Sequence, residues 1–135
     1  MWQEPKTNWV STDYFNYTDY NRIKGNIEYL ESLTKELFLD FDFESMGSDK
    51  TSYTDYPYAD EFTAVENNLQ LMRNRTFLFD NSGSKTWYEN APTPNYEDLN
   101  RIENACIAFQ EGFEKIKANK MKLSIRLGNT SFIKI

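Results

Sequence analysis

The chain has 135 residues, of which 39% are hydrophobic and 16% aromatic, enough for one domain with a modest core rich in large rings. Its 21 acidic residues outnumber its 15 basic residues, and so acidic a chain lacks the basic footprint that a nucleic-acid backbone or an anionic membrane requires. One cysteine excludes an internal disulfide and the absence of histidine removes the commonest metal ligand and general base, so we expect no cofactor, no metal and no enzymatic activity.

Residues 1–15 are predicted to form an extended aromatic arm, because their apolar side chains show no helical period. Trp9 is the candidate anchor of this arm, either on the protein's own core or on a neighbouring subunit. The N-terminus has neither the basic region nor the apolar region of a signal peptide. No segment approaches the roughly 18 apolar residues of a membrane span, so we expect neither export nor membrane insertion.

The first helix is predicted over residues 16–38. Asn16 suits the N-cap, and Asp19 is placed to return a hydrogen bond to the cap and to favour the positive end of the helix dipole. Apolar positions then recur every three or four residues, as along one face of a helix. These positions are Tyr20, Ile23, Ile27, Leu30, Leu33 and Leu37.

Residues 39–58 are predicted to be an acidic, tyrosine-rich loop, followed by a second helix over residues 59–79. The acids suggest a calcium loop, but glycine is missing from the sixth position of the motif and glutamate from the twelfth, so we expect no calcium site. A glycosidase needs two carboxylates on opposite sides of its substrate, and residues 40–60 are where such a pair would be sought. Nothing in the sequence positions two of these carboxylates opposite each other. The apolar positions of the second helix are Phe62, Val65, Leu69, Met72 and Phe79.

Residues 80–94 are predicted to form a second arm, in which Trp87 corresponds to the tryptophan of the first. The third helix is predicted over residues 95–118, with Asn95 as its N-cap and Asp98 as the acid of its first turn. Its apolar positions are Leu99, Ile102, Cys106, Phe109, Phe113 and Ile116. Because the cysteine lies on this apolar face, we expect it to be a small core residue rather than a nucleophile.

Residues 121–135 are predicted to form a β-hairpin. Apolar residues alternate before Gly128-Asn129, which is a typical turn pair, and β-branched and aromatic residues follow it. Phe132 and Ile133 lie in the second predicted strand. They are candidates for packing on the helices or for adding to the sheet of another subunit.

A short motif occurs twice in the chain. Asn-Tyr-x-Asp-x-Asn-Arg-Ile is found at residues 16–23 and again at 95–102, each time after a tryptophan, and residues 65–67 repeat the Glu-Asn of residues 102–104. The repeat predicts a single, mainly α-helical domain with a minor β component. We expect a three-helix bundle with a pseudo-repeated aromatic arm plus helix and a C-terminal β-hairpin.

Asn21 and Arg22, like Asn100 and Arg101, flank the apolar face one turn into their helices. We expect both residue types to bond the backbone of the preceding aromatic arm and to fix its angle to the helix. The local alternative pairs each arginine with the acid three residues before it, which is worth only a few tenths of a kcal/mol. Both interpretations are structural, and neither predicts an active site.

Two stretches resemble small phage and prophage proteins of Gram-positive bacteria, which are usually encoded among tail-tip and baseplate genes. Residues 13–30 carry Asp-Tyr-Phe-Asn-Tyr-x-Asp-Tyr-Asn-Arg-Ile-Lys-x-Asn-Ile-x-Tyr-Leu, and residues 92–103 carry Pro-Thr-Pro-Asn-Tyr-Glu-Asp-Leu-Asn-Arg-Ile-Glu. The resemblance covers roughly residues 5–116. It implies a non-enzymatic virion structural component of the host-adsorption apparatus, made in the host cytoplasm, with no cofactor and no catalytic residues to transfer.

The leading hypothesis is therefore a tail or baseplate subunit or adaptor that contacts other tail proteins or further copies of itself. A first alternative is a module that binds cell-wall polysaccharide through exposed rings in one cleft, whereas the leading hypothesis predicts buried tryptophans. The rings concerned are Trp2, Trp9, Tyr53, Tyr56, Tyr58, Trp87 and Tyr88. A second alternative is an acidic phage-encoded inhibitor that mimics nucleic acid, which needs its acids clustered on one face.

Overall fold

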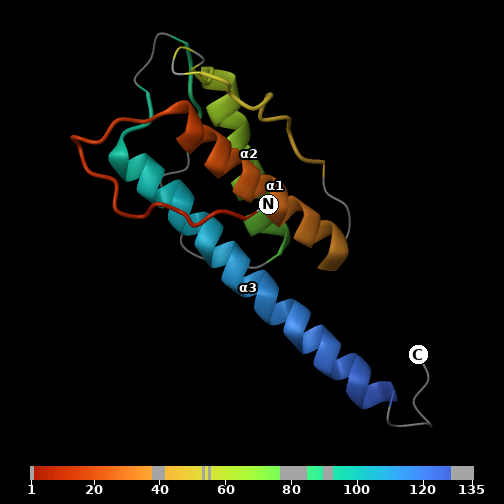
Figure 1. Cartoon of the computed structure of the whole chain (residues 1–135). Coiled ribbons are helices and arrows are strands. Elements are labelled where there is room, and N and C mark those ends of the chain that lie inside the picture. The colour runs from red at the N-terminus through yellow and green to blue at the C-terminus, as the bar shows by residue number, and fades with distance from the viewer. Residues whose placement is uncertain are drawn as a thin grey trace.

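The protein is a bundle of three parallel helices. The computed structural model describes residues 2–37, 42–52, 54, 56–76, 85–89 and 93–128, with side chains up to residue 119. Its helices are α1 (Tyr17–Leu37), α2 (Ala59–Arg75) and α3 (Tyr96–Gly128), and the described part contains no strand. All three helices run in the same direction, and the described part of the segment between α1 and α2 leads back to the end where the helices begin (Figure 1).

The core is built from equivalent positions of the three helices. Counted from the helix starts, each level takes one buried side chain from α1, one from α2 and one from α3, at spacings of three and four residues. This is the seam of a coiled coil, in which such spacing keeps the apolar side chains facing the neighbouring helices. The first four levels are Tyr20, Phe62 and Leu99; Ile23, Val65 and Ile102; Ile27, Leu69 and Cys106; and Leu30, Met72 and Phe109.

Cys106 lies at the position of Ile27 and Leu69 in the other helices, and 1% of its surface is exposed. Burial is the main cause that raises the pKa of its thiol well above the usual range. It is a packing residue of the core, as the apolar period predicts.

Each helix begins with the same hydrogen bond. The acid at its third position accepts a bond from the backbone N–H of the residue before the helix, and this carboxylate also offsets the positive dipole ends that parallel helices bring together. The N···O distances are 2.8 Å for Asn16 and Asp19, 2.7 Å for Tyr58 and Glu61, and 3.0 Å for Asn95 and Asp98. In α3 the bond is reciprocal, since the side-chain oxygen of Asn95 accepts from the N–H of Asp98 at 3.0 Å.

Gly47 permits the close approach of the segment before α2 to the first turn of that helix. Its φ of 81° lies in the left-handed region, and a Cβ at this position would be 1.7 Å from Oε2 of Glu61. Glu61 is fixed there because both of its carboxylate oxygens accept bonds from Nζ of Lys50, each at 2.9 Å. A side chain at position 47 would therefore disturb this buried ion pair.

Two predicted elements end differently from the expectation. The second helix was expected to reach residue 79 but ends at Arg75, and residues 77–84, Phe79 among them, lie outside the described residues. The β-hairpin is wrong for residues 121–128, because α3 continues through them to Gly128. Lysine, methionine, leucine and arginine are good helix formers, and extending an existing helix costs far less than starting a strand pair in isolation. Phe132 and Ile133 lie outside the described residues.

Within the described residues, none of the helices combines the length and the apolar character that crossing a membrane requires.

Candidate interaction surface

Three side chains at equivalent positions hold the extended segments on the bundle. Each accepts a hydrogen bond from the N–H and donates one to the C=O of a single residue, and we call this arrangement a backbone clamp. The accepting and donating distances are 2.7 and 2.8 Å for Asn21 on Lys50, 2.8 and 3.1 Å for Thr63 on Trp87, and 2.9 and 3.0 Å for Asn100 on Trp9. The hydroxyl of Thr63 does in α2 what the amides do in α1 and α3.

The backbone clamps join the three units in a closed ring. We call the described parts of the three extended segments arm 1 (residues 2–16), arm 2 (residues 42–52, 54 and 56–58) and arm 3 (residues 85–89 and 93–95). Arm 1 is held by α3, arm 2 by α1 and arm 3 by α2. The asparagines therefore do bond an arm, but the expectation that each bonds the arm preceding its own helix is wrong. Because the three relations are alike, the bundle has a pseudo-threefold axis along its core.

A second pair of backbone clamps lies one turn further along α1 and α2. Asn26 holds Gln3 at 2.7 and 2.9 Å, and Asn68 holds Glu44 at 2.8 and 2.9 Å. Sequence reasoning missed both, although each asparagine follows the first clamp of its helix by five residues. The equivalent position in α3 is Ala105, which has no group that can bond a backbone.

Buried ion pairs connect neighbouring helices at the level of the repeated motif. Arg22 of α1 bonds the carboxylate of Glu103 of α3 at 2.8 and 2.9 Å, and Arg101 of α3 bonds Glu66 of α2 at 2.7 and 2.6 Å. Both carboxylates are 1% exposed, and both contacts are bidentate. The expectation that the arginines bond arm backbone is wrong, since they neutralise these acids instead. The local alternative is also present for both arginines, since NH1 of Arg22 lies 2.8 Å from Oδ1 of Asp19 and NH2 of Arg101 lies 3.8 Å from Oδ1 of Asp98.

The tryptophans of the two motifs are interior residues. Trp9 is 3% and Trp87 9% exposed, and Trp2 packs its ring 5.8 Å from that of Tyr29. Nε1 of Trp9 donates to Oε2 of Glu103 at 2.5 Å. Trp9 and Trp87 are therefore not available as exposed rings for stacking on sugars.

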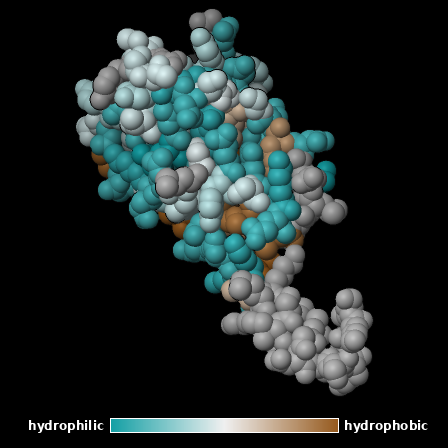
Figure 2. Space-filling model, turned by 45° about the vertical axis from the view of Figure 1, so that its right-hand side comes forward, coloured by the Kyte–Doolittle hydropathy of each residue, from teal (hydrophilic) through white to brown (hydrophobic). Residues whose placement is uncertain are grey.

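Exposed rings gather instead at the end of the bundle where the helices begin. This is the end where each arm joins the first turn of the helix that follows it. The exposed large apolar side chains of the described residues all lie between a clamped residue and the helix that follows it, or at the first residue of a helix. We call these six side chains the tyrosine end: Val10, Tyr14, Tyr56, Tyr58, Tyr88 and Tyr96. On the face shown in Figure 2, by contrast, hydrophilic residues cover most of the bundle and hydrophobic ones reach the surface only in small patches.

A hollow of about 280 Å³ opens at the tyrosine end. Segments that precede all three helices line this hollow: Phe15 before α1, residues 56–57 before α2 and residues 93–94 before α3. The hollow therefore lies where the pseudo-threefold axis leaves the bundle. Its lining is Phe15, Tyr56, Pro57, Phe62, Thr93, Pro94 and Leu99. A hollow with mainly apolar walls and rings at its rim is typical of a surface that receives a side chain of another molecule.

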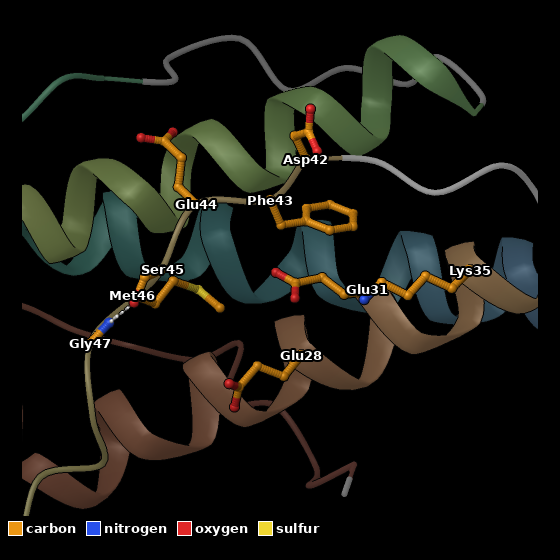
Figure 3. A pocket seen from close by; sticks show the side chains of 9 residues that line it. All are labelled: Glu28, Glu31, Lys35, Asp42, Phe43, Glu44, Ser45, Met46 and Gly47. Carbon is orange, nitrogen blue, oxygen red and sulfur yellow. Dashed lines mark hydrogen bonds between the residues drawn. The ribbon is translucent and has the colours of Figure 1, made fainter.

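A second hollow of about 410 Å³ lies between α1 and arm 2 and is strongly acidic. Glu28, Glu31 and Lys35 enter it from α1, and Asp42 and Glu44 belong to its arm 2 side (Figure 3). Burial, and next the charge of Glu28, raise the pKa of Glu31 to about 7. Among the described residues no group of three or more acidic or cysteine side chains is placed to hold a metal ion.

Several acidic side chains face inward, where they form hydrogen bonds and ion pairs that stabilise the fold. Glu61, Glu66, Asp98 and Glu103 are all buried and bonded to arginine, lysine or backbone N–H groups. They are therefore not part of any acidic surface that would mimic nucleic acid.

Searches of family models, of curated proteins and of solved structures found no match to the chain.

Proposed function

We propose that this chain is a non-enzymatic structural subunit or adaptor of a phage tail or baseplate, assembled into the virion and working by protein–protein contacts. The observation that carries the proposal is the separation of its aromatic residues: the tryptophans are locked inside by backbone clamps, while five tyrosines are exposed together at one end. Tyrosine is enriched in protein interfaces, where a large ring is buried at a small cost in conformational entropy.

The clamps support this proposal because they make the tyrosine end a prepared surface. Each arm is bonded to a helix at Trp9, Lys50 or Trp87, directly before the passage that carries the exposed tyrosines. A segment that is already ordered loses little entropy when a partner covers it, so more of the contact energy appears as affinity. The resemblance of residues 13–30 and 92–103 to tail-tip and baseplate proteins supports the same role.

The experiment is to tag the chain in the phage or prophage genome that encodes it and to purify the particles on a density gradient. We expect the tag to migrate with intact particles and to be labelled by immunogold at the tail tip. The variant Tyr56→Ser/Tyr58→Ser should be made in equal amounts but lost from particles, whereas Glu111→Ala, at an exposed site on the side of α3, should be incorporated normally. Tag found only in the soluble fraction would contradict the proposal.

A second candidate function, binding of cell-wall polysaccharide, is favoured by one observation. Tyr58 and Tyr88, both 67% exposed, line a hollow of about 510 Å³ together with Asp60 and Glu89. Rings that stack on sugar faces, next to carboxylates that accept bonds from hydroxyls, are suited to a saccharide. Co-sedimentation with purified Gram-positive cell walls tests this: binding should disappear in Tyr88→Ala, and no sedimentation of the wild-type chain would exclude it.

A further inference from the structure

Charge is divided sharply along this chain. All 21 acidic residues lie within residues 1–114, together with nine of the 15 basic residues. The remaining six basic residues follow Glu114, and no acidic residue accompanies them. Five of the six belong to the part of α3 between Lys115 and Gly128, which we call the basic segment.

Most of the basic segment projects from the bundle. α3 begins at the same end as α1 but has 33 residues where α1 has 21, so it is longer by roughly 18 Å at 1.5 Å per residue. Nζ of Lys117 still reaches Oε1 of Glu36 in the last turn of α1, at 3.4 Å. Beyond that level the helix leaves its neighbours (Figure 1).

The tyrosine end lies at the opposite end of the molecule and is acidic. Four of its five tyrosines have an exposed acid one or two positions away in the sequence, and Asp13 alone among these acids has an ion-pair partner, Lys6, among the described residues. The pairs are Tyr14 with Asp13, Tyr58 with Asp60, Tyr88 with Glu89, and Tyr96 with Glu97. Such a surface is complementary in charge to the basic segment of the same chain.

We infer that the basic segment of one copy docks on the tyrosine end of a second copy. Lysine and arginine pair with carboxylates and lie favourably over aromatic rings. The chain uses this second contact internally, since Nζ of Lys6 lies 4.2 Å from the ring centre of Trp9 and that of Lys50 lies 5.5 Å from that of Tyr58. Because the two surfaces differ and lie at opposite ends, the contact is heterologous and joins copies head to tail. This inference rests on the proposed assembly role and names the partner as the chain itself.

The test is the solution mass by light scattering from about 1 μM to about 1 mM protein, at about 0.05 M and about 1 M salt. The wild-type chain should exceed its monomer mass of 16.0 kDa as concentration rises and should return to it at high salt. A tail variant, Lys120→Glu/Lys122→Glu/Arg126→Glu, and a face variant, Asp60→Lys/Glu97→Lys, should each stay monomeric. An equimolar mixture of the two variants should associate again, because the intact basic segment of the face variant can dock on the intact tyrosine end of the tail variant.

The mixture is the decisive test. The acidic segment of the tail variant also complements the reversed charge of the face variant, so both contacts of the head-to-tail arrangement can form between the two variants, and the mixture should exceed the monomer mass as the wild-type chain does. Combining all five substitutions in one chain should restore association. Glu111→Lys, at an exposed site on the side of α3, is the control and should associate like the wild-type chain.

Circular dichroism establishes that each variant is folded, and replacement of the same residues by glutamine or asparagine serves where a charge reversal prevents folding. A wild-type chain that stays monomeric throughout, or a tail variant that associates normally, would overturn the inference. A monomeric chain that is nevertheless found in particles would overturn the self-association alone and leave the proposed function standing.

Discussion

Trp9 and Trp87 occupy equivalent positions in arm 1 and arm 3, yet their indole nitrogens have different surroundings. Nε1 of Trp9 donates to the buried carboxylate of Glu103, whereas Nε1 of Trp87 is buried and has no partner among the described residues. Replacing Trp9 by phenylalanine removes a charge-assisted bond and some packing, while the same change at Trp87 removes an unsatisfied donor. We predict that Trp9→Phe destabilises the fold by about 1–2 kcal/mol more than Trp87→Phe does.

Chemical denaturation of the two variants under one condition measures this difference. The two substitutions remove the same atoms from equivalent buried positions, so each is the control for the other. Equal losses of unfolding free energy would show that the bond from Trp9 to Glu103 contributes nothing.

Glu31 makes the stability of the bundle depend on pH. Burial and the charge of Glu28 raise its pKa to about 7, above the ordinary value of 4.5, so the fold favours the protonated form. The contribution is complete at acidic pH, below the pKa in the unfolded chain, and is lost as the pH rises through about 7. We therefore predict that Glu31→Gln stabilises the protein at pH 8 but not at pH 4, by about 1 kcal/mol because the partly exposed side chain is screened by water.

Urea unfolding of the wild-type chain and of Glu31→Gln across this pH range isolates the contribution, because other titrating groups cancel in the difference. Glu28→Gln is a second check, since removing that neighbouring charge should lower the pKa of Glu31 and shift the pH dependence toward acid. A difference between the two proteins that does not change with pH would contradict the assignment.

The arms are attached to the helices at few points, so each backbone clamp should contribute strongly to stability. Removing the side chain of Asn100 costs two hydrogen bonds and leaves the N–H and C=O of Trp9 without their partner. A partly buried group without a hydrogen-bond partner costs about 1–3 kcal/mol. We predict that Asn21→Ala and Asn100→Ala each destabilise the protein by about 2 kcal/mol, with increased hydrogen exchange at the N–H that was clamped.

The matched control is Asn104→Ala, an exposed asparagine on the same helix as Asn100. Alanine is the better helix former, so this substitution should be neutral or slightly stabilising. Hydrogen exchange measured by mass spectrometry should show faster exchange in arm 1 for Asn100→Ala and in arm 2 for Asn21→Ala. Exchange that increases uniformly over the chain in both variants would mean that the clamps do not act locally.

The helices and their core faces are predictable from the sequence, because caps and apolar periods are local signals. The end of α3 is not, since the alternation of residues 123–127 suits a strand as well as a helix, and the preceding helix decides between them. For the clamps, the sequence indicates which side chains take part but not which residues they hold. The repeated asparagines point to a structural role, but the residues they hold lie 29 and 91 positions away in the sequence. Lys50 stands where the other two arms have tryptophan, which hides the third unit of the repeat.

At the scale of the whole molecule, the order of the clamps explains how one chain closes a ring. Arm 1 is the first segment of the sequence, yet α3, the last helix, holds it through Asn100 and Glu103. The N-terminal segment therefore joins the third unit to the first, as arm 2 and arm 3 join the other units. The tyrosine end depends on this closure, because its rings come from all three arms.

The ion pairs across the helices offer the sharpest test of that closure. Arg22 is the bidentate partner of Glu103, and removing it leaves a carboxylate that is 1% exposed with only Trp9 Nε1 and the N–H of Lys6 as donors. An unpaired buried charge costs about 3–5 kcal/mol, whereas replacing both partners by apolar residues of similar size is often nearly neutral. We predict that Arg22→Met destabilises the protein by about 3 kcal/mol and that Arg22→Met/Glu103→Leu recovers at least half of that loss. Thermal and urea unfolding of the single and double variants measure the coupling, and a double variant that is less stable than Arg22→Met would show that Glu103 orders arm 1 even without its arginine.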